Sequence, residues 1–369
     1  MAIDGEEIKK ISELTLSVTV LKNLSGSKAG KLTPHFFIDR YKKDLNKDSF
    51  LLNSLRTSLG SFWETIAEEF AKREGYNVYS PKEFKKSNTI LEATNKVRAE
   101  FTTNRKAQTG ETNRSWLNEK LNKIYKNSGP GKGKKAWPSG DGVDLYFEKD
   151  GKWYIFDIKT VQLNAAGGNK FDRQLIEWIC HKKHQLGKKC NAKDIIAGYI
   201  FPYNSKGDHN SHTDWMADQG GKAKPMTDDE IWAGNKFWKF ITGHDNALDK
   251  IFEGIDSALE NSLVKDSLDE MFVKLDKNPT AEKLDEAANK ITKKFVSYLF
   301  PDIEFSKKMG DQWWWKHKGE TDCTFSRSIN TICDQKKGWR IGLKKFEYEM
   351  EACKCKDKTC KKKVKTIFD

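Results

Sequence analysis

The chain of 369 residues has no uninterrupted apolar run of 18 residues, the length that a membrane-spanning helix requires. Its first residues, Met-Ala-Ile-Asp-Gly-Glu-Glu, also lack the apolar segment of a signal peptide. The seven cysteines are an odd number and include no C-x-x-C pair, so reduced thiols are expected rather than a disulfide framework. These absences predict a soluble, cytoplasmic protein. Its 12 Trp, 21 Phe and 10 Tyr are enough to build a large hydrophobic core.

A glycine-rich segment at 127–140 lacks the GKS or GKT that closes a nucleotide-binding P-loop. The segment reads Asn-Ser-Gly-Pro-Gly-Lys-Gly-Lys-Lys-Ala-Trp-Pro-Ser-Gly, which predicts a flexible, cationic loop. Its glycines permit close approach to a phosphate backbone, and Lys132, Lys134 and Lys135 could pair with phosphates. The alternative is a plain linker.

Positive charge is in excess and unevenly distributed. The chain has 66 Lys and Arg against 53 Asp and Glu, a formal net charge of +13. Residues 120–135 and 344–365 are basic, whereas 245–286 holds twelve acids and five lysines. A basic surface attracts polyanions such as nucleic acids, although a general enrichment in lysine would give the same total.

Two strands flank a turn in the middle of the chain. Residues 143–147 and 153–158 are rich in β-branched and aromatic residues, and Lys149-Asp150-Gly151 between them is typical of a tight turn. In the antiparallel hairpin that this predicts, Asp144 begins one strand and Asp157 ends the next. Strand alternation places Asp157 and Lys159 on one face. Two carboxylates and one amine therefore converge.

Such a group of residues suits the hydrolysis of a phosphodiester. Mg²⁺ prefers oxygen ligands, which Asp144 and Asp157 would supply, and Lys159 could orient the attacking water or offset charge in the transition state. Asp141 is a rival for the first acid, but it lies between two glycines in what reads as the preceding loop. The alternative is a surface hairpin with solvated charges, against which the apolar neighbours predict partial burial.

Asp144 and the run Asp157-Ile158-Lys159 resemble the motif of the PD-(D/E)xK superfamily, to which many type II restriction endonucleases belong. The similarity covers residues 140–178, with Val143 where the motif has proline. It implies an α/β fold, a restriction-endonuclease-like mixed sheet core flanked by helices, with helical N-terminal and C-terminal additions. It also implies Mg²⁺-dependent hydrolysis of double-stranded DNA at a short specific sequence, leaving 5′-phosphate and 3′-hydroxyl ends.

The elements around the hairpin extend this interpretation. Residues 1–75 are predicted to be helical, with one helix that ends at Gly75. This helix resembles the one that lends a glutamate to the metal site in the superfamily. Glu64 or Glu68 is therefore a candidate for a further metal ligand. After a turn at 160–169, a helix from about Lys170 would bring Arg173 and Gln174 to the DNA. Residues 194–203 predict a buried central strand, followed by a loop in which His209 and His212 are weak metal candidates.

Three domains are predicted: a nuclease core at 1–240, a helical packing or dimerisation region at 241–300, and a basic Trp- and Cys-rich region at 301–369. The core would end in Ala-Gly-Asn-Lys-Phe-Trp, which is similar to a segment of restriction enzymes that read GGNCC-type sites. The last region could hold a structural Zn²⁺ with four of its five cysteines, Cys323, Cys333, Cys353, Cys355 and Cys360.

The resemblance further implies a homodimer, matched to a palindromic site, and a cognate DNA methyltransferase. Residues 85–128 are expected to face outward, and four arginines, Arg98, Arg105, Arg114 and Arg327, are candidates for reading guanine. No helicase or ATPase motif is present, which disfavours an ATP-driven restriction subunit. The alternatives are a repair or Holliday-junction nuclease and a DNA-binding protein with an inactive nuclease fold.

Overall fold

The computed structural model describes residues 3–24, 60–107, 109–110, 112–160, 165–203 and 228–276, short stretches within 286–298, and six strands between 303 and 366. For residues 165–169, 271–276 and the six strands, only the backbone is described. The chain divides into two compact units. One comprises Met1–Ile8 and Trp63–Lys250, and the other Lys9–Phe62 and Ile251–Asp369.

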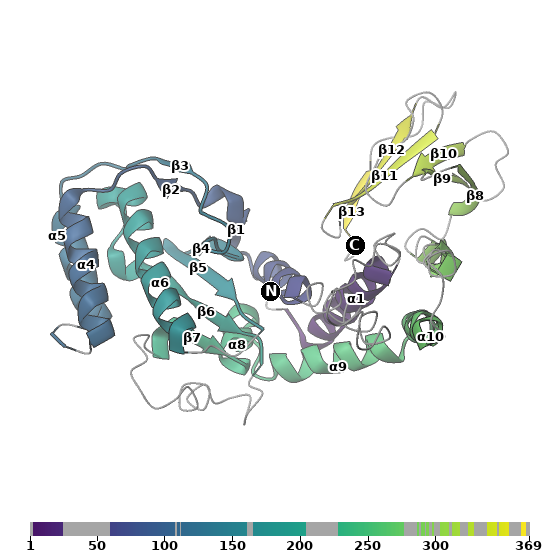
Figure 1. Ribbon diagram of the computed structural model, residues 1–369, viewed down its shortest axis with the longest axis horizontal. Helices are drawn as coiled ribbons and strands as arrows, with labels where there is room; N and C mark the ends of the chain where they lie inside the picture. Colours follow the sequence, from purple (N-terminus) through teal and green to yellow (C-terminus); the bar gives the residue numbers. More distant parts are fainter. Residues whose placement is uncertain are drawn as a thin grey trace, which may run out of the picture. The chain divides into compact units, whose positions relative to one another are not determined.

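A five-stranded mixed sheet forms the centre of the first unit (Figure 1). Its strands, in spatial order, are β1 (Asn77–Tyr79), β4 (Leu145–Lys149), β5 (Lys152–Ile158), β6 (Ile195–Phe201) and β7 (Ile231–Ala233). The pairs β1–β4 and β4–β5 are antiparallel, whereas β5–β6 and β6–β7 are parallel. The predicted hairpin, the predicted central strand and the mixed α/β class are therefore confirmed.

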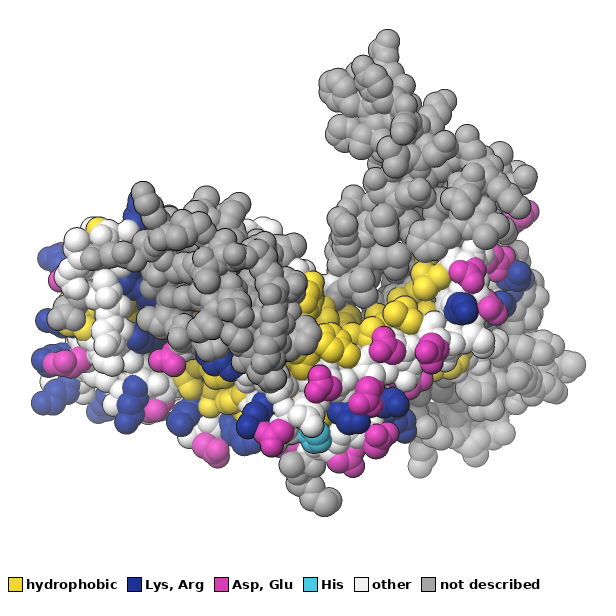
Figure 2. Space-filling model, turned by 90° about the horizontal axis from the view of Figure 1, so that it is seen from below, with side chains coloured by type: hydrophobic (Ala, Val, Ile, Leu, Met, Phe, Trp, Pro, Cys, Tyr) yellow, Lys and Arg dark blue, Asp and Glu magenta, His cyan; other side chains and the backbone are white. Residues whose placement is uncertain are grey.

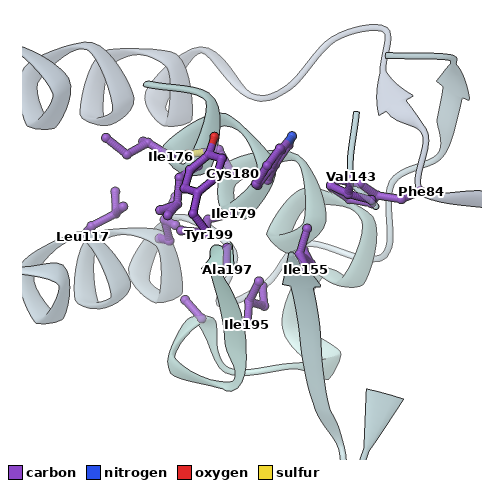
Figure 3. Packing of buried hydrophobic residues seen from close by; sticks show 14 of the residues in the cluster. Phe84, Leu117, Val143, Ile155, Ile176, Ile179, Cys180, Ile195, Ala197 and Tyr199 are labelled. Carbon is purple, nitrogen blue, oxygen red and sulfur yellow. The ribbon is translucent and has the colours of Figure 1, made fainter. Parts of the chain in front are cut away.

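One face of the sheet is covered by α6 (Ala165–Leu186), with α4 (Glu92–Ala107) and α5 (Arg114–Ile124) packed beside it. Alternation along the strands turns Tyr146, Ile155 and Tyr199 toward this face, where they join a buried cluster. Figure 3 shows Ile176, Ile179 and Cys180 of α6 over Ile155 of β5 and Ala197 and Tyr199 of β6. The apolar residues of α6 thus fix the helix against the middle of the sheet.

The opposite face is covered by helical residues 60–73 and by α8 (Asn235–Thr242). Phe156 of β5 packs against Phe237, and Phe70 packs edge-on against Trp238. Phe62, Ile66 and Phe70 of the first of these helices are buried, and Gly75, with φ of 76°, follows its end as expected for a C-cap. The long N-terminal helix α1 spans Gly5–Leu24.

The glycine-rich segment differs from the predicted flexible loop. Its residues Gly133–Lys135 form β3, which pairs with β2 (Lys86–Ser87) as a two-stranded antiparallel ribbon. Short 3₁₀ turns complete this unit at η2 (Pro81–Glu83), η3 (Gly187–Lys189), η4 (Ala192–Asp194) and η5 (Asp228–Glu230). The backbone amide of Gly131 donates to the carbonyl of His184 at 2.9 Å, so the segment is attached to α6.

Helices continue beyond the sheet as α9 (Ala247–Glu260) and α10 (Ser262–Asp276), within the region 241–300 that was predicted to be helical. Acidic side chains gather over α9 on the face shown in Figure 2. None of the helices in the described ranges is long and apolar enough to cross a bilayer.

The region from 301 onward contains strands that the sequence did not predict. One antiparallel sheet contains β8 (Ile303–Met309), β9 (Gln312–His317) and β10 (Thr324–Arg327). A second contains β11 (Gly338–Lys344), β12 (Glu347–Cys353) and β13 (Lys363–Thr366). The Trp-Trp-Trp run forms part of β9, and the sheet pairing at both places is local in sequence.

Candidate active site

The β4–β5 hairpin sets the two predicted acids opposite each other. Its turn residues Asp150 and Gly151 both have positive φ, 53° and 76°, as a two-residue hairpin turn with the twist of its strands requires. The resulting register pairs Leu145 with Phe156, which places Asp144 across from Asp157. The backbone amide of Asp144 donates to the carbonyl of Phe156 at 2.9 Å and continues the pairing by one step.

Both acids are held by neighbouring groups. The backbone amide of Ile158 donates to Asp144 Oδ2 at 2.9 Å. Lys159 Nζ lies 2.6 Å from Asp157 Oδ2, and the Lys159 backbone amide donates to the carbonyl of Ile200 on β6 at 2.8 Å. The structure therefore brings together Asp144, Asp157 and Lys159, the three residues that the sequence singled out.

Burial raises the pKa of one of the two acids. Asp157 is 4% exposed, and burial, followed by the adjacent Asp144 carboxyl, raises the pKa of Asp157 to about 8, although the Lys159 ammonium acts in the opposite direction. Two carboxyls this close resist carrying two negative charges without a compensating cation. A divalent cation would supply that charge, so the donor set fits a hard metal ion such as Mg²⁺.

Within the part of the chain that the structure describes, Asp144 and Asp157 do not belong to a larger cluster of ligand side chains. Among the described residues, no group of three or more His, Cys, Asp or Glu is placed to hold a metal ion. Mg²⁺ is commonly bound through one or two protein carboxylates, so Asp144 and Asp157 alone suit this ion.

The first turns of α6 border the site. Phe171 presents its ring 5.3 Å from Lys159 Nζ, measured to the ring centroid, and its carbonyl accepts the hydroxyl of Tyr199 at 3.1 Å. Tyr199 pairs with Asp157 in the sheet, and burial together with the nearby carboxyls raises the pKa of its phenol well above the usual value. Tyr199 is therefore a neutral donor that fixes α6 beside the acids.

The loop before Asp144 is tied to the same helix. Trp178 Nε1 donates to the carbonyl of Asp141 at 3.0 Å, and Gln174 Nε2 lies 3.5 and 3.4 Å from the carbonyls of Gly140 and Gly142. The Asp141 carboxylate is 3.5 Å from Lys170. The rival acid is thus paired away from Asp157, whereas Asp144 lies opposite it.

Gln174 itself is 5% exposed, which corrects the prediction that its side chain contacts DNA. The prediction treated the start of the helix as open to solvent, whereas the loop at 140–142 covers this residue. Arg173 is exposed, as are Lys132, Lys134 and Lys135 on and around β3, so these four remain candidates for DNA contact.

The segment 85–128 was expected to face outward, which is wrong for Arg105. This side chain is fully buried, with Nη1 3.1 Å from Glu230 Oε1 and Nη2 2.5 Å from Glu230 Oε2. Its Nη2 also lies 3.2 Å from Asp172 on α6. Arg105 therefore joins α4, α6 and η5 and is not available to read a base, and Arg114 is likewise engaged with the Ile195 carbonyl at 3.2 Å.

The two glutamates proposed for the metal site lie on helical residues 60–73. Glu68 is 2.9 Å from Lys72 on the next turn, and Glu64 is half-buried. Trp63, beside Glu64, packs against Tyr203 just after the end of β6. This contact brings the start of the helix toward the end of the sheet that carries the acids.

Other predicted positions lie outside the described residues or have no described side chain. His209 and His212 belong to the first group, as do four of the five C-terminal cysteines, namely Cys323, Cys333, Cys355 and Cys360. Cys353 ends β12 and Arg327 ends β10, with only their backbones described. The zinc prediction and the Arg327 prediction therefore stay predictions.

One of the comparisons with known proteins identifies a family for this chain. No curated protein sequence matches this chain. A family model described as "Type II restriction endonuclease, HinfI" matches residues 6–259, which is more than half of the 369 residues and includes the whole sheet with Asp144, Asp157 and Lys159. The chain therefore belongs to the HinfI family of type II restriction endonucleases, enzymes that cleave double-stranded DNA at specific sites.

Proposed function

We propose that this endonuclease cleaves its DNA site with Mg²⁺ held by Asp144 and Asp157, and that Lys159 is the third catalytic residue. The family implies a divalent metal. The observation that carries the proposal is the opposition of Asp144 and Asp157 across the hairpin, with Lys159 Nζ 2.6 Å from one of the acids. When bound, the cation would act as a Lewis acid and lower the pKa of a coordinated water.

The chain's own residues would prepare the reaction in three ways. The Ile158 amide orients the Asp144 carboxylate, because it occupies one lone pair of Oδ2 and leaves the others for a ligand. Lys159 keeps a positive charge next to Asp157 and, at 25% side-chain exposure, can reach a phosphoryl oxygen or the attacking water. The aromatic ring of Phe171 covers one side of that ammonium and limits its rotamers.

Glu64 is proposed as an additional acid at the metal site, with Glu68 as the alternative. Support comes from the packing of Trp63 against Tyr203, which directs this end of the helix to the end of β6. Lys132, Lys134, Lys135 and Arg173 are proposed to contact DNA phosphates, since all four are exposed cations attached to rigid backbone.

The recognition site is proposed to be a five-base-pair palindrome with an unspecified central pair. HinfI, for which the family is named, recognises GANTC. The GGNCC-type resemblance at Ala233–Trp238 has the same symmetry but different bases. A site with a two-fold axis suits a homodimer, and protection of host DNA would require a methyltransferase specific for the same sequence.

Digestion of unmethylated plasmid and phage DNA tests these proposals. With Mg²⁺ we expect discrete fragments whose ends report the sequence, and with EDTA none. Asp157→Asn removes a charge and keeps the shape, so it should lower cleavage by at least about a hundredfold, in the range seen when metal or electrostatic catalysis is removed. Asp150→Asn is the matched control, because it makes the same change in the hairpin turn, where asparagine tolerates φ of 53°.

Full activity of the Asp157→Asn protein would contradict the assignment of the metal site. Fragments at random positions, or cleavage restricted to branched DNA, would contradict site-specific cleavage by this chain and favour the repair-nuclease alternative.

A further inference from the structure

Six cationic side chains lie along the C-terminal half of α6, and we refer to them as the flanking track. Five are exposed and one, Lys86, is half-exposed. They come from three elements that are far apart in the sequence: β2, the stretch around β3, and η3. The six are Lys86, Lys132, Lys134, Lys135, Lys188 and Lys189.

Hydrogen bonds hold the three elements to α6 in order. The Lys188 amide donates to the carbonyl of Ser128 at 2.9 Å, and the Ser87 amide donates to His181 Nδ1 at 3.2 Å. Further toward the active site, Trp178 Nε1 holds the carbonyl of Asp141. The stretch from 128 to 142 therefore runs antiparallel to α6, from η3 to the loop that precedes Asp144.

Close packing makes this attachment rigid. A Cβ at Gly131 would lie 2.2 Å from His184 Nε2, and one at Gly187, which has φ of 56°, would lie 2.5 Å from the carbonyl of Ser128. Only glycine fits at 187, where the close atoms are backbone and φ is positive, whereas a side chain at 131 would displace the His184 ring. The backbone of these lysines is therefore fixed. When a ligand binds, only their side chains lose conformational entropy.

Among the described residues, only Lys86 of the six cations in the track has a carboxylate partner. Of the carboxylates along this side of α6, Glu177 lies 3.4 Å from both Lys86 and Arg98. Lys132, Lys134, Lys135, Lys188 and Lys189 have no ion pair with any described residue. A surface of one sign on a fixed scaffold favours a polyanion with regularly spaced charges, as the DNA backbone provides.

The distance to the active site determines which part of the DNA the track could reach. Phe171 contacts Lys159, and Leu186 is 15 residues further along α6. At about 1.5 Å per residue this is about 22 Å, or roughly six base pairs at about 3.4 Å each. A five-base-pair site extends at most about five pairs from a point of cleavage at its edge, so on DNA that runs along α6 the phosphates at the track lie outside the site.

We propose that the flanking track binds the phosphates of DNA adjoining the recognition site, about six base pairs from the point of cleavage. This inference rests on the proposed function, because it takes the acids at 144 and 157 as the place of cleavage. It extends that function, because it predicts that the length of the flanking duplex, whatever its sequence, determines affinity.

Fluorescence anisotropy on two duplexes tests this. Both carry the site found by plasmid digestion, one with three and one with fifteen base pairs on each side. We expect the wild type to bind the longer duplex at least about tenfold more tightly at 150 mM salt, since each phosphate contact contributes to the salt-dependent affinity. The double variant Lys188→Gln/Lys189→Gln should lose most of that difference, and its log Kd against log salt slope on the longer duplex should fall by about 1.8.

The double variant Lys96→Gln/Lys106→Gln is the matched control. It removes the same charge from exposed positions on α4 and should keep the preference for the longer duplex. Equal affinity of the wild type for both duplexes would overturn the inference, as would an unchanged preference in the Lys188→Gln/Lys189→Gln protein. Cleavage of either duplex with Mg²⁺ reports separately on the proposed function, so the two failures are distinguishable.

Discussion

Arg105 offers the sharpest test of the structure, because the sequence suggests a DNA-reading residue and the structure shows a buried one. We consider Arg105→Met, which keeps an unbranched apolar stem and removes the charged guanidinium. In the structure the guanidinium is completely enclosed and lies within 3.2 Å of Asp172 and 3.1 Å of Glu230. The variant would leave both carboxyls buried without a cation.

Removing one partner of a buried ion pair typically costs about 3–5 kcal/mol, because the remaining charge is left uncompensated. Burial already raises the pKa of Asp172 to about 7 while Arg105 opposes that rise. Without the guanidinium the pKa of Asp172 should rise further. A carboxyl with a raised folded-state pKa contributes stability that is present below its unfolded pKa, near 4, and is lost as the pH rises. The destabilisation should therefore be smaller at pH 5 than at pH 7.5.

Urea unfolding of the wild type and Arg105→Met at these two pH values measures the effect. The triple variant Arg105→Met/Asp172→Asn/Glu230→Gln removes the stranded charges and should recover at least half of the lost stability, because replacement of a whole buried ionic group is far less costly than breaking it. A stability of Arg105→Met within about 1 kcal/mol of wild type, together with altered base preference at the DNA site, would refute the burial argument.

The remaining predictions concern local features of the first unit. Burial, with Lys86 and Arg98 nearby, lowers the pKa of His181 to about 4. The stability that this residue contributes above pH 6.5 should therefore decline by about 3 kcal/mol as the pH falls to 4. Urea unfolding of His181→Asn at a series of pH values should show a flatter dependence of stability on pH. Gly187→Ala should destabilise the protein by about 1–3 kcal/mol in thermal unfolding, since the residue has positive φ and meets a carbonyl; no change would show that η3 can shift. If the C-terminal cysteines bind zinc, metal analysis of the wild type should find about one equivalent. A Cys353→Ser/Cys355→Ser protein should lose that zinc. A wild type without zinc would reject the prediction.

The parts of the fold that could be predicted are those fixed by short-range rules. The Asp150-Gly151 turn and the alternation on each side of it specify the β4–β5 hairpin, and therefore the opposition of Asp144 and Asp157, from about 15 consecutive residues. The buried run of β6 and the stripe of the helix at 60–73 follow from periodicity alone.

The parts that escaped prediction depend on contacts between distant segments. Polar composition suggested that Arg105 faces outward, and nothing local reveals that Glu230, 125 residues later, encloses it. Gln174 lies at the start of a helix, where exposure is usual, but the loop at 140–142 covers it. In the same way, the glycines of 127–140 suggested a flexible loop, whereas Gly131 lets the backbone lie against the His184 ring of α6. Nothing within the segment itself reveals this contact, because it depends on where α6 lies.

The hairpin has a further consequence for enzyme engineering. Both acids, the amide that orients one of them and Lys159 belong to a single stretch from 144 to 159, whereas the candidate DNA-contacting residues lie before or after it. The proposed catalytic residues on the hairpin and the proposed DNA-contacting residues therefore lie in separate stretches of the sequence. Chimaeras that exchange the flanking segments between family members, with this stretch left intact, offer a rational starting point for endonucleases with new targets.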